Sequence, residues 1–280
     1  MAIKNCNGFV GFGNNYCGYS LVDGKFFAGQ PCRFNGLDQE QVIVTGAPYT
    51  DQLYRKSASL QDVYADISDF DKVVAWVPTF RENMNKVRVD CQSNFPLGIP
   101  ILYDVESVKR VNAFLVKNRV LLIMKPHPEQ DLDVIKRLDV SNIRILKNED
   151  LLKHNIQTNE FLAQTDAMIG DYSGIYFDYL LLNRPIGITL DDFELYKQQH
   201  GFAFDNILDI LVGEHIYKVD DMIQFVQHLV DGQDIKKSER EEIKKKTHDF
   251  DDGRSAERVY RFIIGQMKQR GFDVEGFESL

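Results

Sequence analysis

The chain has 280 residues, of which 33 are Lys or Arg and 42 are Asp or Glu, so its net charge is −9. Neutralising nucleic-acid phosphates needs a basic excess, so this balance argues against a general nucleic-acid-binding protein. Hydrophobic residues make up 44% and aromatic residues 11% of the sequence, which is enough to form a core and excludes bulk disorder.

Residues 1–40 are rich in Gly, Asn, Phe and Cys, and their weak periodicity predicts short strands and loops. After them come short apolar runs, each followed by turn residues. β-Branched residues are frequent in these runs and prolines or glycines close several of them, so each run predicts a strand. The six predicted strands lie at Gln41–Gly46, Lys72–Phe80, Val120–Pro128, Ile143–Leu146, Ala167–Gly174 and Arg184–Leu190.

The apolar character of these strands is nearly continuous rather than alternating, which is typical of strands buried on both faces of a parallel sheet. Between and after them, apolar residues recur at helical spacing. Helices are predicted at Val105–Lys117, Asn159–Gln164, Ile175–Leu182, Val219–Leu229, Ser238–Lys246 and Ala256–Met267. The alternation predicts an α/β fold, a doubly wound parallel sheet flanked by helices with right-handed crossovers.

Ligands bind such sheets beyond the carboxyl ends of the strands, and three strand ends carry reactive side chains. Thr79 and Arg81 offer a hydroxyl and a guanidinium that suit a phosphate. Lys125 and His127 stand in a stiff K-P-H-P loop, where a histidine can act as acid or base or bind an anion. The segment Asp171–Gly174 precedes a predicted helix, whose first amides favour an anion. Each has a plain alternative: a surface arginine, a structural histidine and an ordinary helix cap.

Other familiar motifs are absent from the sequence. It contains no Walker loop, no G-x-G-x-x-G that opens a helix and no G-x-S-x-G elbow, which disfavours the enzyme classes built on them. The four cysteines form no C-x-x-C pair and predict neither a zinc site nor a disulfide framework. No apolar run approaches the roughly 18 residues that predict a membrane span.

Taken together, the motifs at these strand ends indicate a protein family more specifically than any one of them does. A K-P-H-P loop, followed further along by D-Y-S, an aromatic helix and L-L-N-R-P-I, resembles the CDP-glycerol glycerophosphotransferase family, whose members build or prime teichoic acids and related capsules. The resemblance runs from about Val42 to Phe262. Further matching segments are Gly46–Asp51, Trp76–Arg81, Tyr196–Asp205 and Phe250–Arg258.

The resemblance implies a GT-B-like fold of Rossmann-type domains. Residues 1–45 are then expected to be a remnant of an amino-terminal acceptor domain. Residues 46–280 are expected to be the Rossmann-like domain that binds the CDP-alcohol, with carboxyl-terminal helices. The implied reaction moves glycerol phosphate, or a related polyol phosphate, from a CDP-alcohol donor to a polymer or lipid-linked acceptor of the cell wall or capsule, and releases CMP.

Carried over residue by residue, the resemblance also implies a site. The expected catalytic residue is His127. The expected donor-diphosphate-binding residues are Lys125, His127, Asp171, Tyr172, Ser173, Gly174, Thr79 and Arg81. Neither a metal nor another cofactor is expected, since these groups supply the positive charge and the hydrogen-bond donors. The implied partners are CDP-glycerol or a related donor and a polyol-phosphate or glycan acceptor, with no nucleic acid; the implied location is cytoplasmic, with contact to the inner face of the membrane left open.

The sequence also departs from the family pattern. Tyr49 and His200 stand where the family has arginines, and Gly174 stands where it has a second serine. Members usually carry a fuller amino-terminal domain whose histidine acts as base on the acceptor, and none of the six histidines lies before residue 46. The missing base favours a non-catalytic nucleotide-binding paralogue or a split enzyme, whereas the retained Lys125–His127 and Asp171–Ser173 segments favour donor binding. An active transferase with an unusual or partner-supplied acceptor site is preferred on balance over that paralogue and over a GT-B glycosyltransferase that uses a nucleotide sugar.

Overall fold

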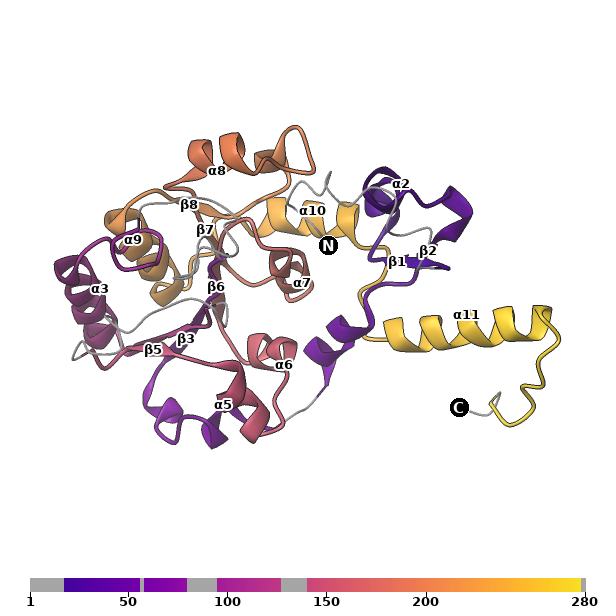
Figure 1. The fold of residues 1–280 in the computed structure, drawn as a ribbon. Helices are drawn as coiled ribbons and strands as arrows, with labels where there is room; N and C mark the ends of the chain where they lie inside the picture. Colours follow the sequence, from indigo (N-terminus) through magenta and orange to yellow (C-terminus); the bar gives the residue numbers. More distant parts are fainter. Residues whose placement is uncertain (1–17, 56–57, 80–94, 127–139, 278–280) are drawn as a thin grey trace. The chain divides into compact units, whose positions relative to one another are not determined.

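The computed structural model describes residues 18–55, 58–79, 95–126 and 140–277 (Figure 1). The chain divides into two compact units. Of the described residues, 18–55 and 245–277 form the terminal unit, and those between 58 and 244 form the sheet unit. The expected split into residues 1–45 and 46–280 concerns acceptor and donor binding, and it stays a prediction. In the described ranges, no helix is long and apolar enough to cross a membrane.

The sheet unit is built on six parallel strands in the order β5–β4–β3–β6–β7–β8. Their bounds are β3 Lys72–Trp76, β4 Val120–Met124, β5 Ile143–Ile145, β6 Ala167–Gly170, β7 Ile186–Thr189 and β8 Glu214–Ile216. The chain runs outward from β3 to β5, returns to the other side of β3 at β6, and then runs outward again. The predicted parallel sheet is confirmed, and its topological switch point lies between β3 and β6.

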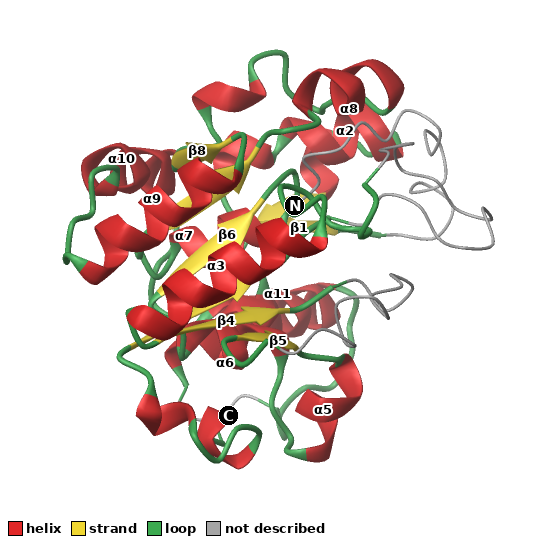
Figure 2. Ribbon diagram, turned by 90° about the vertical axis from the view of Figure 1, so that its left-hand side faces the viewer, coloured by secondary structure: helices red, strands yellow, loops and turns green. Residues whose placement is uncertain are grey.

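Helices cover both faces of this sheet (Figure 2). Their bounds are α3 Val105–Lys117, α5 Asn148–Lys153, α6 Thr158–Ala163, α7 Ile175–Leu180, α8 Phe193–Gln199, α9 Val219–Val230 and α10 Lys237–Thr247. Figures 1 and 2 show α3 and α9 on one face and α6 and α7 on the other. The predicted helices within these ranges are confirmed, and α3 has the predicted bounds.

The start of α3 shows how the sequence sets a helix boundary. Asp104 has an extended backbone, and its carboxylate accepts a hydrogen bond of 2.7 Å from the amide of Ser107. This N-cap satisfies one of the amides that a helix leaves without an internal partner. Val108, Val111 and Leu115 then recur at helical spacing and are buried. One face of α3 is thereby fixed against the sheet.

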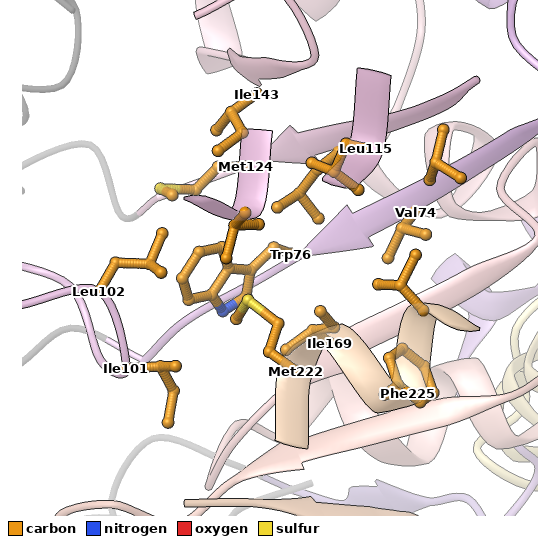
Figure 3. Close-up of a cluster of buried hydrophobic side chains, with 14 of the residues drawn as sticks. Val74, Trp76, Ile101, Leu102, Leu115, Met124, Ile143, Ile169, Met222 and Phe225 are labelled. Carbon is orange, nitrogen blue, oxygen red and sulfur yellow. The ribbon is translucent and has the colours of Figure 1, made fainter. Parts of the chain in front are cut away.

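The main core lies between the sheet and the helices α3 and α9 (Figure 3). Val74 and Trp76 of β3 enter this core, while Val73 and Ala75 are buried without belonging to it, as strand alternation requires. Trp76 is fully buried at the last residue of its strand. Truncating such a side chain typically costs about 3–5 kcal/mol. The core therefore holds β3 firmly up to the point where its functional loop begins.

Some elements were not predicted. Strand β8 was missed because Glu214–Ile216 has three residues and no apolar run. Among residues 1–40 the strand β1, Ser20–Val22, agrees with the expected short strands, but α2, Gly29–Asn35, is a helix where loops were expected. Helix α2 has Pro31 within its first turn and ends at Gly36, whose φ of 67° suits glycine. Its two buried residues are too few for a clear helical period.

The terminal unit pairs β1 in parallel with β2, Val42–Val44, and contains α11, Ser255–Gln269. The buried carboxylate of Asp51 accepts hydrogen bonds of 2.8 Å from the amides of Ser255 and Ala256. It thus binds the first two amides of α11 from a segment more than 200 residues earlier in the chain. Gly46 has a φ of 77°, and a Cβ there would clash with the Ser255 hydroxyl. The segments Gly46–Asp51 and Phe250–Arg258, both matched to the family, therefore pack against each other in one hydrogen-bonded contact, called here the joint.

Replacing Asp51 with Ala should loosen this joint. The change removes two charge-assisted hydrogen bonds to a helix start, and a lost cap of this kind costs about 1–2 kcal/mol. Hydrogen exchange of the amides at the start of α11 should accelerate, and the midpoint of urea unfolding should fall. Glu40→Ala is the control, because Glu40 is an exposed carboxylate of the same unit. Unchanged exchange in Asp51→Ala would show that Asp51 does not hold α11.

Candidate functional site

Three adjacent strands end together at the carboxyl edge of the sheet. The pairing of β3 with β4 runs to Trp76 and Met124, and the pairing of β3 with β6 runs to Trp76 and Ile169. The backbone ladder continues one residue further. The backbone amide of Lys125 donates to the Trp76 carbonyl at 2.8 Å, and that of Val77 donates to the Ile169 carbonyl at 2.9 Å. Residues that follow these three strands are therefore held at one edge.

Asp171 connects two of these strand ends. Its carboxylate accepts hydrogen bonds from the backbone amide of Thr79, at 2.8 and 3.0 Å, and from the Thr79 hydroxyl. Asp171 is only 1% exposed. The bond spans the switch point between β3 and β6, where open α/β sheets bind ligands. Its geometry makes Asp171 a positioning residue for Thr79.

Lys125 stands on the other side of β3, at the end of β4. Its ammonium donates a hydrogen bond of 2.6 Å to the side-chain oxygen of Asn148, the first residue of α5. Burial lowers the pKa of Lys125, because a partly dry environment disfavours its charged form. An amide partner orients the ammonium without neutralising its positive charge, whereas a carboxylate would neutralise it. Asn148 was missed by sequence reasoning, since it belongs to no motif.

The loop Asp171–Gly174, here called the D-Y-S loop, has a buried part and a partly exposed part. Tyr172 is fully buried, and its hydroxyl donates to Asp192 at 3.1 Å. Its ring lies 4.5 Å from that of Tyr196 in α8, so its side chain anchors the following segment and only its backbone is left to face a ligand. Ser173 and Gly174 are partly exposed and precede α7, which begins without a side-chain cap in the described part of the chain. Helix α7 has six residues, so the Ser173 hydroxyl and single amides matter more than a helix dipole.

Two of the expected site residues, His127 and Arg81, lie outside the described residues. The structure therefore brings together Lys125, Thr79 and the Asp171–Gly174 loop, and leaves the expected roles of His127 and Arg81 as predictions. Across the residues that are described, no cluster of three or more His, Cys, Asp or Glu side chains is arranged to hold a metal ion.

The architecture is that of known enzymes of wall teichoic acid synthesis. A solved structure of the wall teichoic acid polymerase TagF superposes with a TM-score of 0.65 at 18% identity, covering 91% of this chain and 59% of that one. At this identity the likeness concerns the fold alone. It confirms the predicted GT-B-like α/β class.

Curated relatives point the same way. The chain is 25% identical over 231 residues to the teichoic acid glycerol-phosphate primase of Bacillus subtilis (strain 168), which covers 81% of this chain and 52% of the relative. It is 26% identical over 225 residues to the teichoic acid ribitol-phosphate polymerase TarK of Staphylococcus aureus (strain NCTC 8325 / PS 47), covering 73% and 40%. The chain thus spans about half the length of the curated relatives it matches.

A family model covers most of the described structure. Residues 18–265 match the model of CDP-glycerol:poly(glycerophosphate) glycerophosphotransferases. The match includes both compact units and every strand end discussed above. The chain belongs to the CDP-glycerol:poly(glycerophosphate) glycerophosphotransferase family.

Proposed function

We propose that this chain transfers glycerol phosphate, or a related polyol phosphate, from a CDP-alcohol to a hydroxyl of a cell-wall or capsule acceptor and releases CMP. One observation carries the proposal. In a member of this family, Lys125, Thr79 and Ser173 follow three adjacent strands, β4, β3 and β6, at the carboxyl edge of the sheet, and Asp171 links the loops after β3 and β6. The Lys125 ammonium and the Ser173 hydroxyl at such an edge suit a diphosphate, while the Thr79 hydroxyl already donates to Asp171 and orders the loop after β3.

The relatives support both kinds of polyol. One is named as a glycerol-phosphate primase and another as a ribitol-phosphate polymerase. A solved structure of a TagF variant was obtained with CDPG. These names support a CDP-linked polyol as donor, and glycerol is the first choice because the family model is described by it.

The proposed step breaks one phosphoanhydride bond and forms one phosphoester bond. The acceptor oxygen attacks the phosphorus that carries the polyol, and the bridging oxygen leaves with its electron pair as part of CMP. The acceptor hydroxyl gives up its proton to a base. Negative charge grows on the departing CMP phosphate, so the Lys125 ammonium and the Ser173 hydroxyl would stabilise the transition state more than the ground state. His127 would donate a proton or hydrogen bond to the leaving oxygen.

Calorimetric titration of the purified chain tests the donor class. CDP-glycerol and CMP should bind with micromolar dissociation constants, and UDP-glucose should not bind, because the proposal assigns the site to a cytidine nucleotide. Binding of UDP-glucose alone would move the assignment to a sugar transferase. Binding of CDP-glycerol without turnover on any offered acceptor would indicate a nucleotide-binding paralogue.

Replacing His127 with Ala should lower turnover of CDP-glycerol by about 10²- to 10⁴-fold, the usual contribution of a general acid or base. Donor affinity should change much less. CMP release would be measured with a polyol-phosphate acceptor, and the circular dichroism spectrum would check the fold. His154→Ala is the matched control, since His154 follows the last residue of α5 and belongs to none of the three strand-end loops. Equal turnover by both variants would remove His127 from the proposed mechanism.

Replacing Asn148 with Asp should weaken CDP-glycerol binding roughly tenfold, because an ion pair would neutralise the Lys125 charge that faces the donor. In the wild type, affinity should fall as the pH rises through the lowered pKa of Lys125, where the ammonium loses its proton. The new carboxylate raises that pKa, so the remaining pH dependence should move to higher pH.

The control for this experiment is Asn155→Asp, which adds the same charge at an exposed position after α5. Its affinity and pH profile should match those of the wild type. If Asn148→Asp and Asn155→Asp bind the donor equally well, the Lys125–Asn148 contact has no role in donor binding.

A further inference from the structure

A cavity opens beyond the end of β7, one strand away from the Asp171–Gly174 loop. Its volume is about 770 Å³, within the range of roughly 300–1,000 Å³ that is usual for small-molecule sites. Its walls come from the segment before α3, from the β7–α8 connection and from the residue after β8. The residues that matter here are Phe95, Tyr103, Asp191, Phe193, Glu194 and Tyr217.

Aromatic rings form much of the wall. Phe95 and Tyr103 stack on each other with centroids 5.9 Å apart and an interplanar angle of 22°. Tyr103 is 41% exposed and Tyr217 is 53% exposed, so both rings present apolar surface at the cavity wall. A ligand with an apolar face would cover part of this surface.

The charge of the cavity has one sign. Asp191, Asp192 and Glu194 line it, and none of its described lining residues is Lys, Arg or His. Carboxylates accept hydrogen bonds and repel anions. A phosphate group is therefore disfavoured here, although one is expected over β3, β4 and β6 at the same edge of the sheet.

Asp191 also holds a strained turn against this cavity. One of its oxygens accepts hydrogen bonds from the Ile101 amide at 2.8 Å and from the Tyr103 hydroxyl at 2.6 Å. Ile101 has a φ of 67°, a conformation that β-branched residues rarely adopt and that clusters at binding sites. The other Asp191 oxygen is buried and has no hydrogen-bond partner among the described residues. A turn held in this way fixes the Tyr103 ring at the cavity wall.

We propose that this cavity binds a neutral sugar ring of the acceptor, an inference that rests on the proposed transferase function. A sugar ring has an apolar C–H face for the aromatic rings and hydroxyl donors for the carboxylates. A polyol-phosphate chain would bring negative charge to an acidic wall. The edge of cytosine presents two acceptors and one amino donor, so most of it would face carboxylates that also only accept. The sugar is the one reactant whose chemistry matches every wall.

The test uses the full chain and a panel of neutral methyl glycosides, followed by saturation-transfer NMR. At least one glycoside should bind the wild type. Tyr217→Ala should weaken that binding at least about tenfold, because it removes an exposed ring from the wall. Phe272→Ala is the matched control, since Phe272 is 60% exposed and does not line the cavity. Glu194→Gln should weaken glycoside binding and reduce the repulsion of glycerol 3-phosphate.

Any of three results would overturn the inference. The first is that no glycoside binds the wild type. The second is that Tyr217→Ala and Phe272→Ala bind the glycoside equally well, and the third is that glycerol 3-phosphate or cytidine displaces it. Displacement by cytidine would assign the cavity to the nucleoside of the donor instead. Parallel titration with CDP-glycerol separates the two proposals. Donor binding without glycoside binding removes the sugar site alone, and glycoside binding without donor binding removes the transferase function and leaves a sugar-binding cavity.

Discussion

The hydrogen bonds between Asp171 and Thr79 fix the geometry on which the rest of the site depends. They join the ends of β3 and β6, the two strands between which the sheet reverses its direction of growth. A buried carboxylate is tolerated when its oxygens accept hydrogen bonds, as they do here. Because the backbone amide of Thr79 takes part, Asp171 holds the chain itself and not only a side chain. The loop after β3 is therefore held in register with the D-Y-S loop.

The fold was largely readable from the sequence because its determinants are local. Continuous apolar runs predicted five of the six strands of the sheet, and helical spacing predicted α3 to its ends. The exceptions lack such signals: β8 has three residues and two polar side chains, and α2 has too few buried residues for a period. Both are held by their neighbours in space rather than by their own pattern.

The site was readable only in part, because its contacts join distant segments. Strand ends predicted where Lys125, Thr79 and Ser173 would stand. No local rule links Thr79 to Asp171, which is 92 residues further along the chain, or gives Lys125 its partner Asn148. Tyr172 shows that a motif does not tell a side-chain role from a backbone role. It lies within a motif of the site, yet its side chain packs against Tyr196 and bonds to Asp192, so the structure gives it an anchoring role.

Charge is distributed unevenly along the carboxyl edge of the sheet, and this distribution assigns each proposed reactant to its own part of the edge. The chain as a whole is acidic, so a donor diphosphate can bind only where positive charge is local and uncompensated. Among the described residues Lys125 satisfies that condition, because the partner of its ammonium there is the amide of Asn148, and its partial burial strengthens its attraction for an anion. Beyond β7 the charge reverses and carboxylates and aromatic rings replace the cation. An anionic donor would be repelled by the carboxylates beyond β7. A neutral acceptor would leave the charge of Lys125 without an anionic partner. The same edge can then hold both reactants in one orientation, which is what transfer of a phosphate between them requires.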